Sequence, residues 1–205
     1  MTSNFWNNVF KNKKWGEYPS EHLVRFVAQN YYRCKNKKKI RILEVGCGAG
    51  ANIRYLCEQG FDVYGLDYSR VAIKQAQEML KKNKINHSAS LTCSNISNIP
   101  FENNFFDLII DIECLYSLTP ENKDLAIKEI YRTLKNKGRG TLFSQIFSDK
   151  TTSPILVEKN SIKWINKYKI KNFFPYFDKI HYEIATRTVN NKKYIVEEFL
   201  TKCVK

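Results

Sequence analysis

The sequence lacks the features that mark membrane, secreted and metal-binding proteins. No apolar run approaches the roughly 20 residues that a helix needs to cross a bilayer. The amino-terminal residues hold no basic segment followed by an apolar one, so we expect no signal peptide. The six cysteines form no Cys-x-x-Cys pair and no cluster with histidine at the spacing of a zinc site. These absences predict a cytoplasmic protein with reduced cysteines, no metal site and no membrane insertion.

Acidic residues are scarce relative to basic ones. The chain has 20 aspartate and glutamate residues against 34 lysine and arginine residues, a formal net charge of +14 at pH 7. Such a charge suits an anionic partner, which would be a phosphorylated substrate, RNA or a membrane surface. It also arises without function where a genome favours lysine and asparagine codons, and both residues are abundant here. Both interpretations stay open, and the second is favoured because nucleic-acid recognition relies more on arginine.

Short apolar runs alternate with helical patterns along the 205 residues. Aliphatic runs followed by glycine are typical of parallel strands buried on both faces, and apolar residues three and four apart predict helices. We predict strands at 40–45, 62–67, 88–93, 105–110, 140–147, 178–188 and 193–203. We predict helices at 20–33, 51–59, 120–135 and 162–174 and one capped by Ser69. The alternation predicts an α/β fold, a doubly wound, seven-stranded, mostly parallel sheet with an antiparallel C-terminal hairpin turning at Asn190 and Asn191.

A glycine-rich turn follows the first predicted strand and precedes a helix. Gly46, Gly48 and Gly50 permit the positive φ and the close backbone approach that a loop around a ligand requires. Asp67 ends the second strand about 20 residues after the first glycine, where a carboxylate can accept both hydroxyls of a ribose. The spacing is Gly-x-Gly-x-Gly, not the Gly-x-Gly-x-x-Gly of dinucleotide-binding proteins, and Glu44 precedes it. Because a carboxylate there repels a pyrophosphate and attracts an ammonium and a sulfonium, the loop predicts S-adenosylmethionine as the cofactor.

Four motifs follow one another in order along the central part of the chain. They are Ile42-Leu-Glu-Val-Gly-Cys-Gly-Ala-Gly50, Val63-Tyr-Gly-Leu-Asp67, Ile99-Pro-Phe101 and Phe106-Asp-Leu-Ile-Ile110. Together they resemble the motifs of class I S-adenosylmethionine-dependent methyltransferases, and most of all the small-molecule branch (methyltransferase domain 11-like). The resemblance implies a Rossmann-like enzyme with S-adenosylhomocysteine as product. It also implies one domain over residues 1–205, with a lid and helix at 1–35, a cofactor-binding core at 40–147, and a cap segment and terminal hairpin at 148–205.

The resemblance also implies roles for individual residues of the cofactor site. The loop at 44–50 would hold the methionine moiety, with Cys47 as a small side chain beneath the ligand. Asp67 would bind the ribose, and Tyr68 would pack near the adenine.

Two later segments would complete the site. Asn95 stands where the family usually has aspartate, and its carbonyl can still accept a hydrogen bond from the adenine amino group. Ile96 would offer its backbone N–H to an adenine ring nitrogen. Asp111, just past the fourth predicted strand, lies where a backbone carbonyl of the family meets the amino group of the cofactor.

The residues after the fourth strand would face the transferred methyl group. Tyr116 and Glu113 are the candidate catalytic residues, because a hydroxyl acceptor needs a group that orients it or takes its proton. Each could instead be structural, as an aromatic that closes the cleft or as a solvated carboxylate. Trp15 and Tyr18 belong to an aromatic-rich segment before the first helix, and we predict that this lid brings them onto cofactor or substrate.

The predicted reaction is methyl transfer to a small metabolite, at an oxygen of an anionic acceptor of the phosphorylated, nucleotide-linked or sugar type. An RNA or protein methyltransferase is an alternative that would explain the charge. A non-catalytic S-adenosylmethionine-binding protein is another, because the sequence assigns no general base. We interpret His22 and His181 as structural, and Arg187 is weak evidence for an anionic substrate. The acceptor atom and the oligomeric state stay open.

Overall fold

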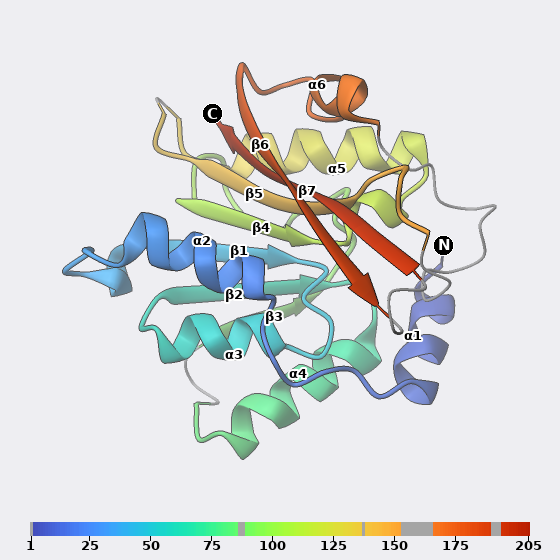
Figure 1. Ribbon diagram of the computed structural model, residues 1–205. Coiled ribbons are helices and arrows are strands. Elements are labelled where there is room, and N and C mark those ends of the chain that lie inside the picture. Colours follow the sequence, from blue (N-terminus) through green and yellow to red (C-terminus); the bar gives the residue numbers. More distant parts are fainter. Residues whose placement is uncertain (1, 86–88, 137, 153–165, 190–193) are drawn as a thin grey trace.

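The strands of the computed structural model form one mixed sheet (Figure 1). The structure describes residues 2–205 except 86–88, 137, 153–165 and 190–193. The strand order is β3-β2-β1-β4-β5-β7-β6, with the first five strands parallel and β7 antiparallel to both β5 and β6. The strands span Arg41–Val45 (β1), Asp62–Asp67 (β2), Ala89–Cys93 (β3), Leu108–Ile112 (β4), Thr141–Phe147 (β5), Lys179–Val189 (β6) and Tyr194–Val204 (β7). The predicted seven-stranded sheet with an antiparallel C-terminal hairpin is confirmed.

Helices cover both faces of the sheet. Ile42 and Leu43 are neighbours on β1, so their side chains point to opposite faces, and they belong to two different buried clusters. Leu23 of α2 and Ile53 of α3 share the cluster of Ile42, whereas Ile130 of α5 shares that of Leu43. Figure 1 shows α5 and α6 on one side of the sheet and α2 and α3 on the other. The helices span Ser3–Asn12 (α1), Glu21–Tyr31 (α2), Ala51–Glu58 (α3), Arg70–Lys82 (α4), Pro120–Thr133 (α5) and Ile170–Phe173 (α6).

Side chains at the helix starts explain where the helices begin. Ser20 and Ser69, the predicted caps, each accept a hydrogen bond from a backbone N–H of the first turn of α2 and α4. Thr119 does the same for α5, whose first residue is Pro120. The sequence patterns predict no helix before residue 20, whereas α1 forms there with Thr2 as its cap. Within the described residues, no helix is both long and apolar enough to cross a membrane.

The fourth strand and the helix after it begin and end differently from the prediction. We predict a strand at 105–110, but β4 spans Leu108–Ile112, so Asp111 lies inside the strand rather than past it. Phe106 instead pairs with Leu134 in an isolated bridge, in which Lys135 donates its N–H to the Phe106 carbonyl at 2.9 Å. The bridge requires an extended backbone at Leu134, which ends α5 at Thr133 rather than at Lys135.

The helix predicted at 162–174 is shorter in the structure. Residues 162–165 lie outside the described residues, as do Ser88 of the third predicted strand and both asparagines of the predicted hairpin turn. Within the described part, a 3₁₀ turn at Lys167–Lys169 leads into the single turn of α6. Pro175 follows closely, and a proline disfavours helical backbone at the residue before it, so the helix stops at Phe173.

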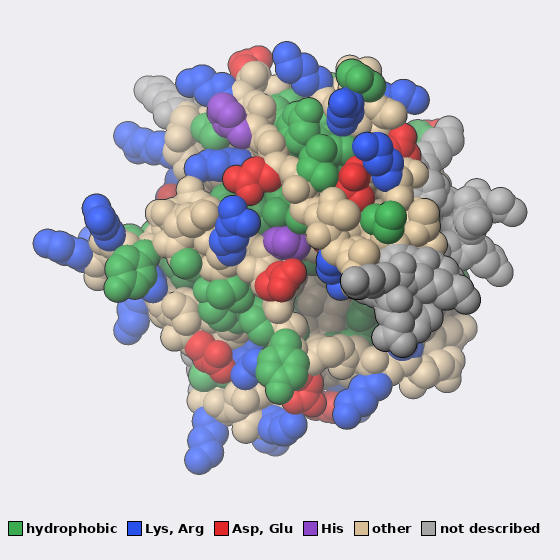
Figure 2. All heavy atoms as spheres, in the orientation of Figure 1, with side chains coloured by type: hydrophobic (Ala, Val, Ile, Leu, Met, Phe, Trp, Pro, Cys, Tyr) green, Lys and Arg blue, Asp and Glu red, His purple; other side chains and the backbone are tan. Residues whose placement is uncertain are grey.

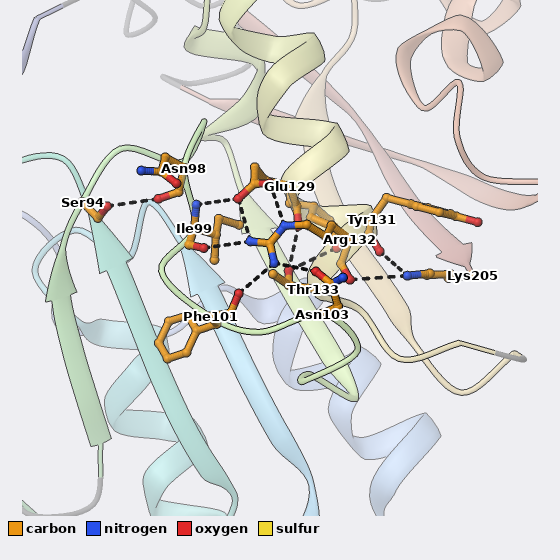
Figure 3. A network of polar contacts seen from close by, with 11 residues as sticks. Ser94, Asn98, Ile99, Phe101, Asn103, Glu129, Tyr131, Arg132, Thr133 and Lys205 are labelled. Atoms are coloured by element: carbon orange, nitrogen blue, oxygen red, sulfur yellow. Dashed lines mark hydrogen bonds and ion pairs between the residues drawn. The ribbon is translucent and has the colours of Figure 1, made fainter.

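An arginine on α5 holds the loop that follows β3 (Figure 3). The Arg132 guanidinium donates to the carbonyls of Ile99 and Phe101 at 2.9 and 2.8 Å and to both carboxylate oxygens of Glu129. Glu129 in turn accepts the Ile99 N–H at 2.9 Å. One charged pair therefore fixes both polar backbone groups of Ile99 and sets the path of the loop beyond Asn95.

Replacing Arg132 by alanine is expected to lower the free energy of unfolding by about 2–3 kcal/mol, because charge-assisted hydrogen bonds are lost and two carbonyls lose their donor. Urea unfolding measures the loss. Lys128→Ala, which removes an exposed ion pair with Asp124 on the same helix, is the control and should leave the free energy of unfolding nearly unchanged. Equal losses in the two variants would contradict the anchoring role.

Candidate active site

The glycine loop is fixed between the end of β2 and two neighbouring segments. The backbone N–H groups of Gly46 and Cys47 both donate to the Leu66 carbonyl, at 2.7 and 3.0 Å. Gly46 has φ +68°, and a Cβ there would lie 2.6 Å from the Cβ and Sγ of Cys114. Gly50 has φ +87°, and its Cβ would lie 2.8 Å from the Cβ of Ala76. Only glycine satisfies both the dihedral angle and the close packing at these two positions.

Asp67 closes the loop from the end of β2. Its carboxylate accepts hydrogen bonds from the N–H of Gly48 at 2.9 Å and of Ser69 at 2.8 Å. The side chain is buried, and burial raises its pKa while these backbone donors partly offset the shift. Each oxygen keeps a further lone pair, so the carboxylate can still accept a hydroxyl donor from the cavity beside it.

Glu44 carries a buried oxygen without a partner. Asn52 of α3 donates its side-chain amide to Oε1 at 2.6 Å, but Oε2 is buried without a hydrogen-bond partner, at a residue that lines the cavity. Burial, the largest cause, raises the pKa of Glu44 to about 8. A buried orphan oxygen costs free energy unless a donor reaches it, and a cationic donor would also restore the ionised form. This position therefore fits the ammonium of the expected cofactor.

The residues that we expect around the adenine line the same cavity, but their side chains differ in exposure. Tyr68 is 42% exposed, Ile96 is buried and Asn95 is exposed. The Asn95 carbonyl oxygen, the group expected to accept from adenine, accepts the N–H of Ser97 at 3.0 Å. Its second lone pair and its amide N–H₂ are what Asn95 offers to a ligand.

The Asp111 carboxylate makes its hydrogen bonds inside the protein and does not line the cavity. Its carboxylate accepts the N–H groups of Cys114 and Leu115, both at 2.9 Å, and the Ser144 hydroxyl at 2.5 Å. The residue is fully buried and does not line the cavity. Burial raises its pKa to about 6, against the effect of these donors. Asp111 thereby shapes the turn that carries Glu113 and Tyr116.

The N-terminal segment lies over the glycine loop, as a lid would. α1 is tied to the start of α4, where Asn7 accepts a hydrogen bond from the Ser69 hydroxyl at 2.8 Å. The Trp15 ring packs against Phe10, with centroids 4.9 Å apart, and a Cβ on Gly48 would lie 3.4 Å from the Phe10 ring. Trp15 and Tyr18 both border the cavity.

The two candidate catalytic residues line the same cavity, in the turn whose Cys114 packs against Gly46 of the glycine loop. Glu113 has φ +61°, a strained conformation for a side chain of its size, and such strain is concentrated at functional sites. Burial and the neighbouring Glu198 raise the pKa of Glu113 to about 8. Burial also raises the pKa of the Tyr116 phenol, so at neutral pH this hydroxyl is a hydrogen-bond donor and not a base.

Sequence comparisons agree with this geometry. The family model described as a methyltransferase domain matches residues 42–138. The chain is 29% identical over 113 residues to norajmaline N-methyltransferase of Rauvolfia serpentina, covering 55% of this chain and 37% of that protein. It is 30% identical over 122 residues to the ubiquinone biosynthesis O-methyltransferase of Pelagibacter ubique, covering 56% and 49%. The chain thus spans less than half of the length of either relative.

The fold itself matches that of solved structures. One is phosphoethanolamine N-methyltransferase 2 of Haemonchus contortus in complex with S-adenosyl-L-methionine, with a TM-score of 0.72 and 16% identity over 98% of this chain and 60% of that chain. The chain thus has the fold of solved S-adenosylmethionine-dependent methyltransferases, and its residues 42–138 match a methyltransferase domain. Its cofactor is S-adenosylmethionine, as the glycine loop predicts.

The methyltransferase domain brings nearly all the predicted site residues to one cavity of about 700 Å³. The cavity is lined by these residues that we expect to bind the cofactor: Trp15, Tyr18, Glu44, Gly46, Cys47, Gly48, Gly50, Asp67, Tyr68, Asn95 and Ile96. Glu113 and Tyr116 also line it. Asp111 is the exception, because its side chain is enclosed by the turn that it caps. The roles of the individual residues stay predictions.

Polar residues outside the predicted set of catalytic and cofactor-binding residues line the far end of the cavity, next to β5, β7 and β6. They are Ser20, His22, Gln145, Arg187 and Glu198. The Ser20 hydroxyl donates to Gln145 at 2.8 Å, and the Gln145 amide donates to Glu198 at 3.1 Å. A glutamine inside an apolar strand was the available signal, because a buried amide requires partners. Among the described residues, no group of histidine, cysteine and carboxylate side chains could hold a metal ion.

Proposed function

We propose that the chain transfers a methyl group from S-adenosylmethionine to a hydroxyl of a small metabolite. The observation that carries the proposal is one cavity that joins the Glu44 loop to a polar end with Glu113 and Tyr116. Its volume of about 700 Å³ is that of a small-molecule site. The cofactor supplies an activated methyl group, and the protein holds the acceptor in line and excludes water.

A hydroxyl suits this lining better than an amine or a thiol does. A hydroxyl must lose its proton to react, so its methylation depends on polar side chains around the acceptor more than that of an amine or a thiol does. The Tyr116 phenol would donate a hydrogen bond that orients the acceptor, and the protonated Glu113 would do the same. The matched relatives include an N-methyltransferase and an O-methyltransferase, so the choice of atom depends on this lining.

One arginine supports an acceptor that carries an anionic group. Arg187 borders the cavity with its side chain 53% exposed, and its neighbours there include Glu113 and Glu198. A single guanidinium can pair with one anionic group, and the carboxyl groups beside it would repel a second one. We therefore propose that the acceptor carries one phosphate or carboxylate and is a sugar-type or nucleotide-linked compound. On the face in Figure 2 the basic side chains are spread out among acidic ones and form no single patch, which favours a small acceptor over RNA.

A screen with labelled S-adenosylmethionine tests the proposal. Hydroxyl compounds with and without one phosphate or carboxylate, matched amines and a short RNA would be compared by formation of S-adenosylhomocysteine. We expect transfer to an anionic hydroxyl compound, with kcat/KM at least tenfold above its neutral analogue. Arg187→Gln should remove this preference, whereas Arg25→Gln, an exposed arginine on α2, should keep it. Cofactor binding without transfer to any acceptor would refute the enzyme, and transfer to RNA alone would refute the small-metabolite class.

A further inference from the structure

A buried carboxylate organises the far end of the cavity. Glu198 of β7 is 1% exposed, although it lines the cavity. Gln145 of β5 donates to its Oε1 at 3.1 Å, and the Arg187 guanidinium of β6 lies 3.6 Å from the same oxygen. Its other oxygen, Oε2, lies 3.5 Å from the Nε2 atom of His22. A buried charge needs partners of this kind, and three elements from distant parts of the chain supply them.

His22 reaches the cavity from the first turn of α2. Its side chain is 14% exposed, and the Ser20 cap that fixes the start of the helix also donates to Gln145. The imidazole faces the Glu198 carboxylate through Nε2, and Glu21 of its own helix lies 3.7 Å from the same nitrogen. If the ring proton sits on Nε2, next to these carboxylates, the lone pair of Nδ1 is the one that can accept a further proton.

The other titratable groups at this end are poorly suited to take a proton near neutral pH. Glu113, next to Glu198, is largely protonated there because its pKa is raised to about 8. The Tyr116 phenol has a raised pKa and keeps its proton. Arg187 of β6 is a permanent cation. The charges around the imidazole are therefore the carboxylates Glu21 and Glu198 and the guanidinium of Arg187, a set that accommodates one added positive charge.

We propose that His22 is the catalytic base of the methyl transfer and that Glu198 is its positioning residue. The inference rests on the proposed function. As the acceptor oxygen forms its bond to the methyl carbon, the carbon–sulfur bond breaks and its electron pair remains on sulfur. The O–H proton passes to Nδ1 of His22, and the resulting imidazolium is balanced by the Glu198 carboxylate.

The test compares His22→Asn, Glu198→Gln and the control His181→Asn, an exposed histidine on β6. Calorimetry with S-adenosylmethionine should give dissociation constants within about threefold of the wild type in all three, because no hydrogen bond or ion pair joins these side chains to residues 44–50. With the best hydroxyl compound of the screen, kcat should fall by about 10²–10⁴-fold in His22→Asn, fall less in Glu198→Gln, and be unchanged in the control.

The thiol analogue of the same acceptor separates a base from a packing residue. A thiol ionises by itself at about pH 8.5, so transfer to it at pH 9 should be nearly equal in wild type and His22→Asn. Equal losses with hydroxyl and thiol would overturn the inference while leaving the proposed function in place. Absence of transfer by the wild type would overturn both.

The ring nitrogens of His22 give a readout that needs no turnover. In the protein bound to S-adenosylhomocysteine at pH 8, nitrogen-15 spectra should show the proton on Nε2 and a bare Nδ1, with His22→Asn identifying the signals. Glu198→Gln should mix the two tautomers, because the amide no longer requires a donor from Nε2. A proton fixed on Nδ1 in the wild type would overturn the assignment of the base.

Discussion

Gly46→Ala is expected to lower the free energy of unfolding by about 2–4 kcal/mol and to weaken S-adenosylmethionine binding at least tenfold. The first part of the cost is the φ of +68°, which a Cβ makes unfavourable by about 1–2 kcal/mol. The second is overlap, since the new Cβ would lie 2.6 Å from both Cβ and Sγ of Cys114. Relief of that overlap moves the turn after β4 or the glycine loop, and both line the cofactor cavity.

A second glycine distinguishes the cost of the positive φ from the cost of the overlap with Cys114. Gly60 also has a positive φ, +87°, but a Cβ there would meet nothing within 4 Å. Gly60→Ala should therefore lose only about 1–2 kcal/mol and bind the cofactor with unchanged affinity. Urea unfolding and calorimetry measure the two quantities. Equal stability losses and equal affinities in the two alanine variants would show that the collision with Cys114 has no consequence.

The double variant Gly46→Ala/Cys114→Gly completes the comparison. It removes both side-chain atoms that the new Cβ would meet. Cofactor affinity should recover relative to Gly46→Ala, although the φ cost remains. Additive losses in the double-mutant cycle would contradict a direct contact between the two positions.

The glycine loop shows what local sequence can specify. Gly46, Gly50 and Asp67 act through backbone geometry within one βαβ unit, so their spacing alone indicates their arrangement. The strands of the sheet could also be predicted from the sequence, because strands buried on both faces are short aliphatic runs. The start of β4 could not be predicted. The run from Phe105 to Ile110 is mostly apolar, and it shows no periodicity that would distinguish the isolated bridge at Phe106 from the strand that begins at Leu108.

The far end of the cavity shows what local sequence leaves out. His22, Gln145 and Glu198 lie in three elements that meet only because β7 inserts between β5 and β6 and α2 packs on the same sheet. None has a motif, and the histidine alone resembles any helix-face histidine. The Asp111 carboxylate is a further example, because its role in capping the turn could not be read from its position after an apolar run. The contact expected between a backbone carbonyl at this position and the cofactor stays a prediction.

Glu44→Gln is expected to weaken S-adenosylmethionine binding by about 10–100-fold at pH 8, the value of one charge-assisted hydrogen bond. The glutamine oxygen can still accept from Asn52, as Oε1 does at 2.6 Å. Its amide N–H₂ then occupies the place of the orphan Oε2 and faces the cofactor ammonium with a donor. Glu58→Gln, the same loss of charge at an exposed position of α3, is the control and should leave the affinity within about twofold.

The raised pKa of Glu44 predicts the direction in which the affinity for S-adenosylmethionine changes with pH. Glu44 has a pKa of about 8 in the free protein, so at pH 7 most molecules hold the proton. A bound ammonium favours the carboxylate, so the pKa falls on binding and a proton is released. Affinity should therefore rise by about tenfold per pH unit from pH 6 toward pH 8 and level off there.

Calorimetry at pH 7 in two buffers of different ionisation enthalpy counts the released protons directly. The wild type should release close to one proton per cofactor bound, and Glu44→Gln should release almost none and show a flat affinity below pH 8. Asp67 also has a raised pKa, but two backbone donors already favour its ionised form, so its share of the release should be small. Undiminished release in Glu44→Gln would show that another group carries the proton and that Oε2 is not the partner of the ammonium.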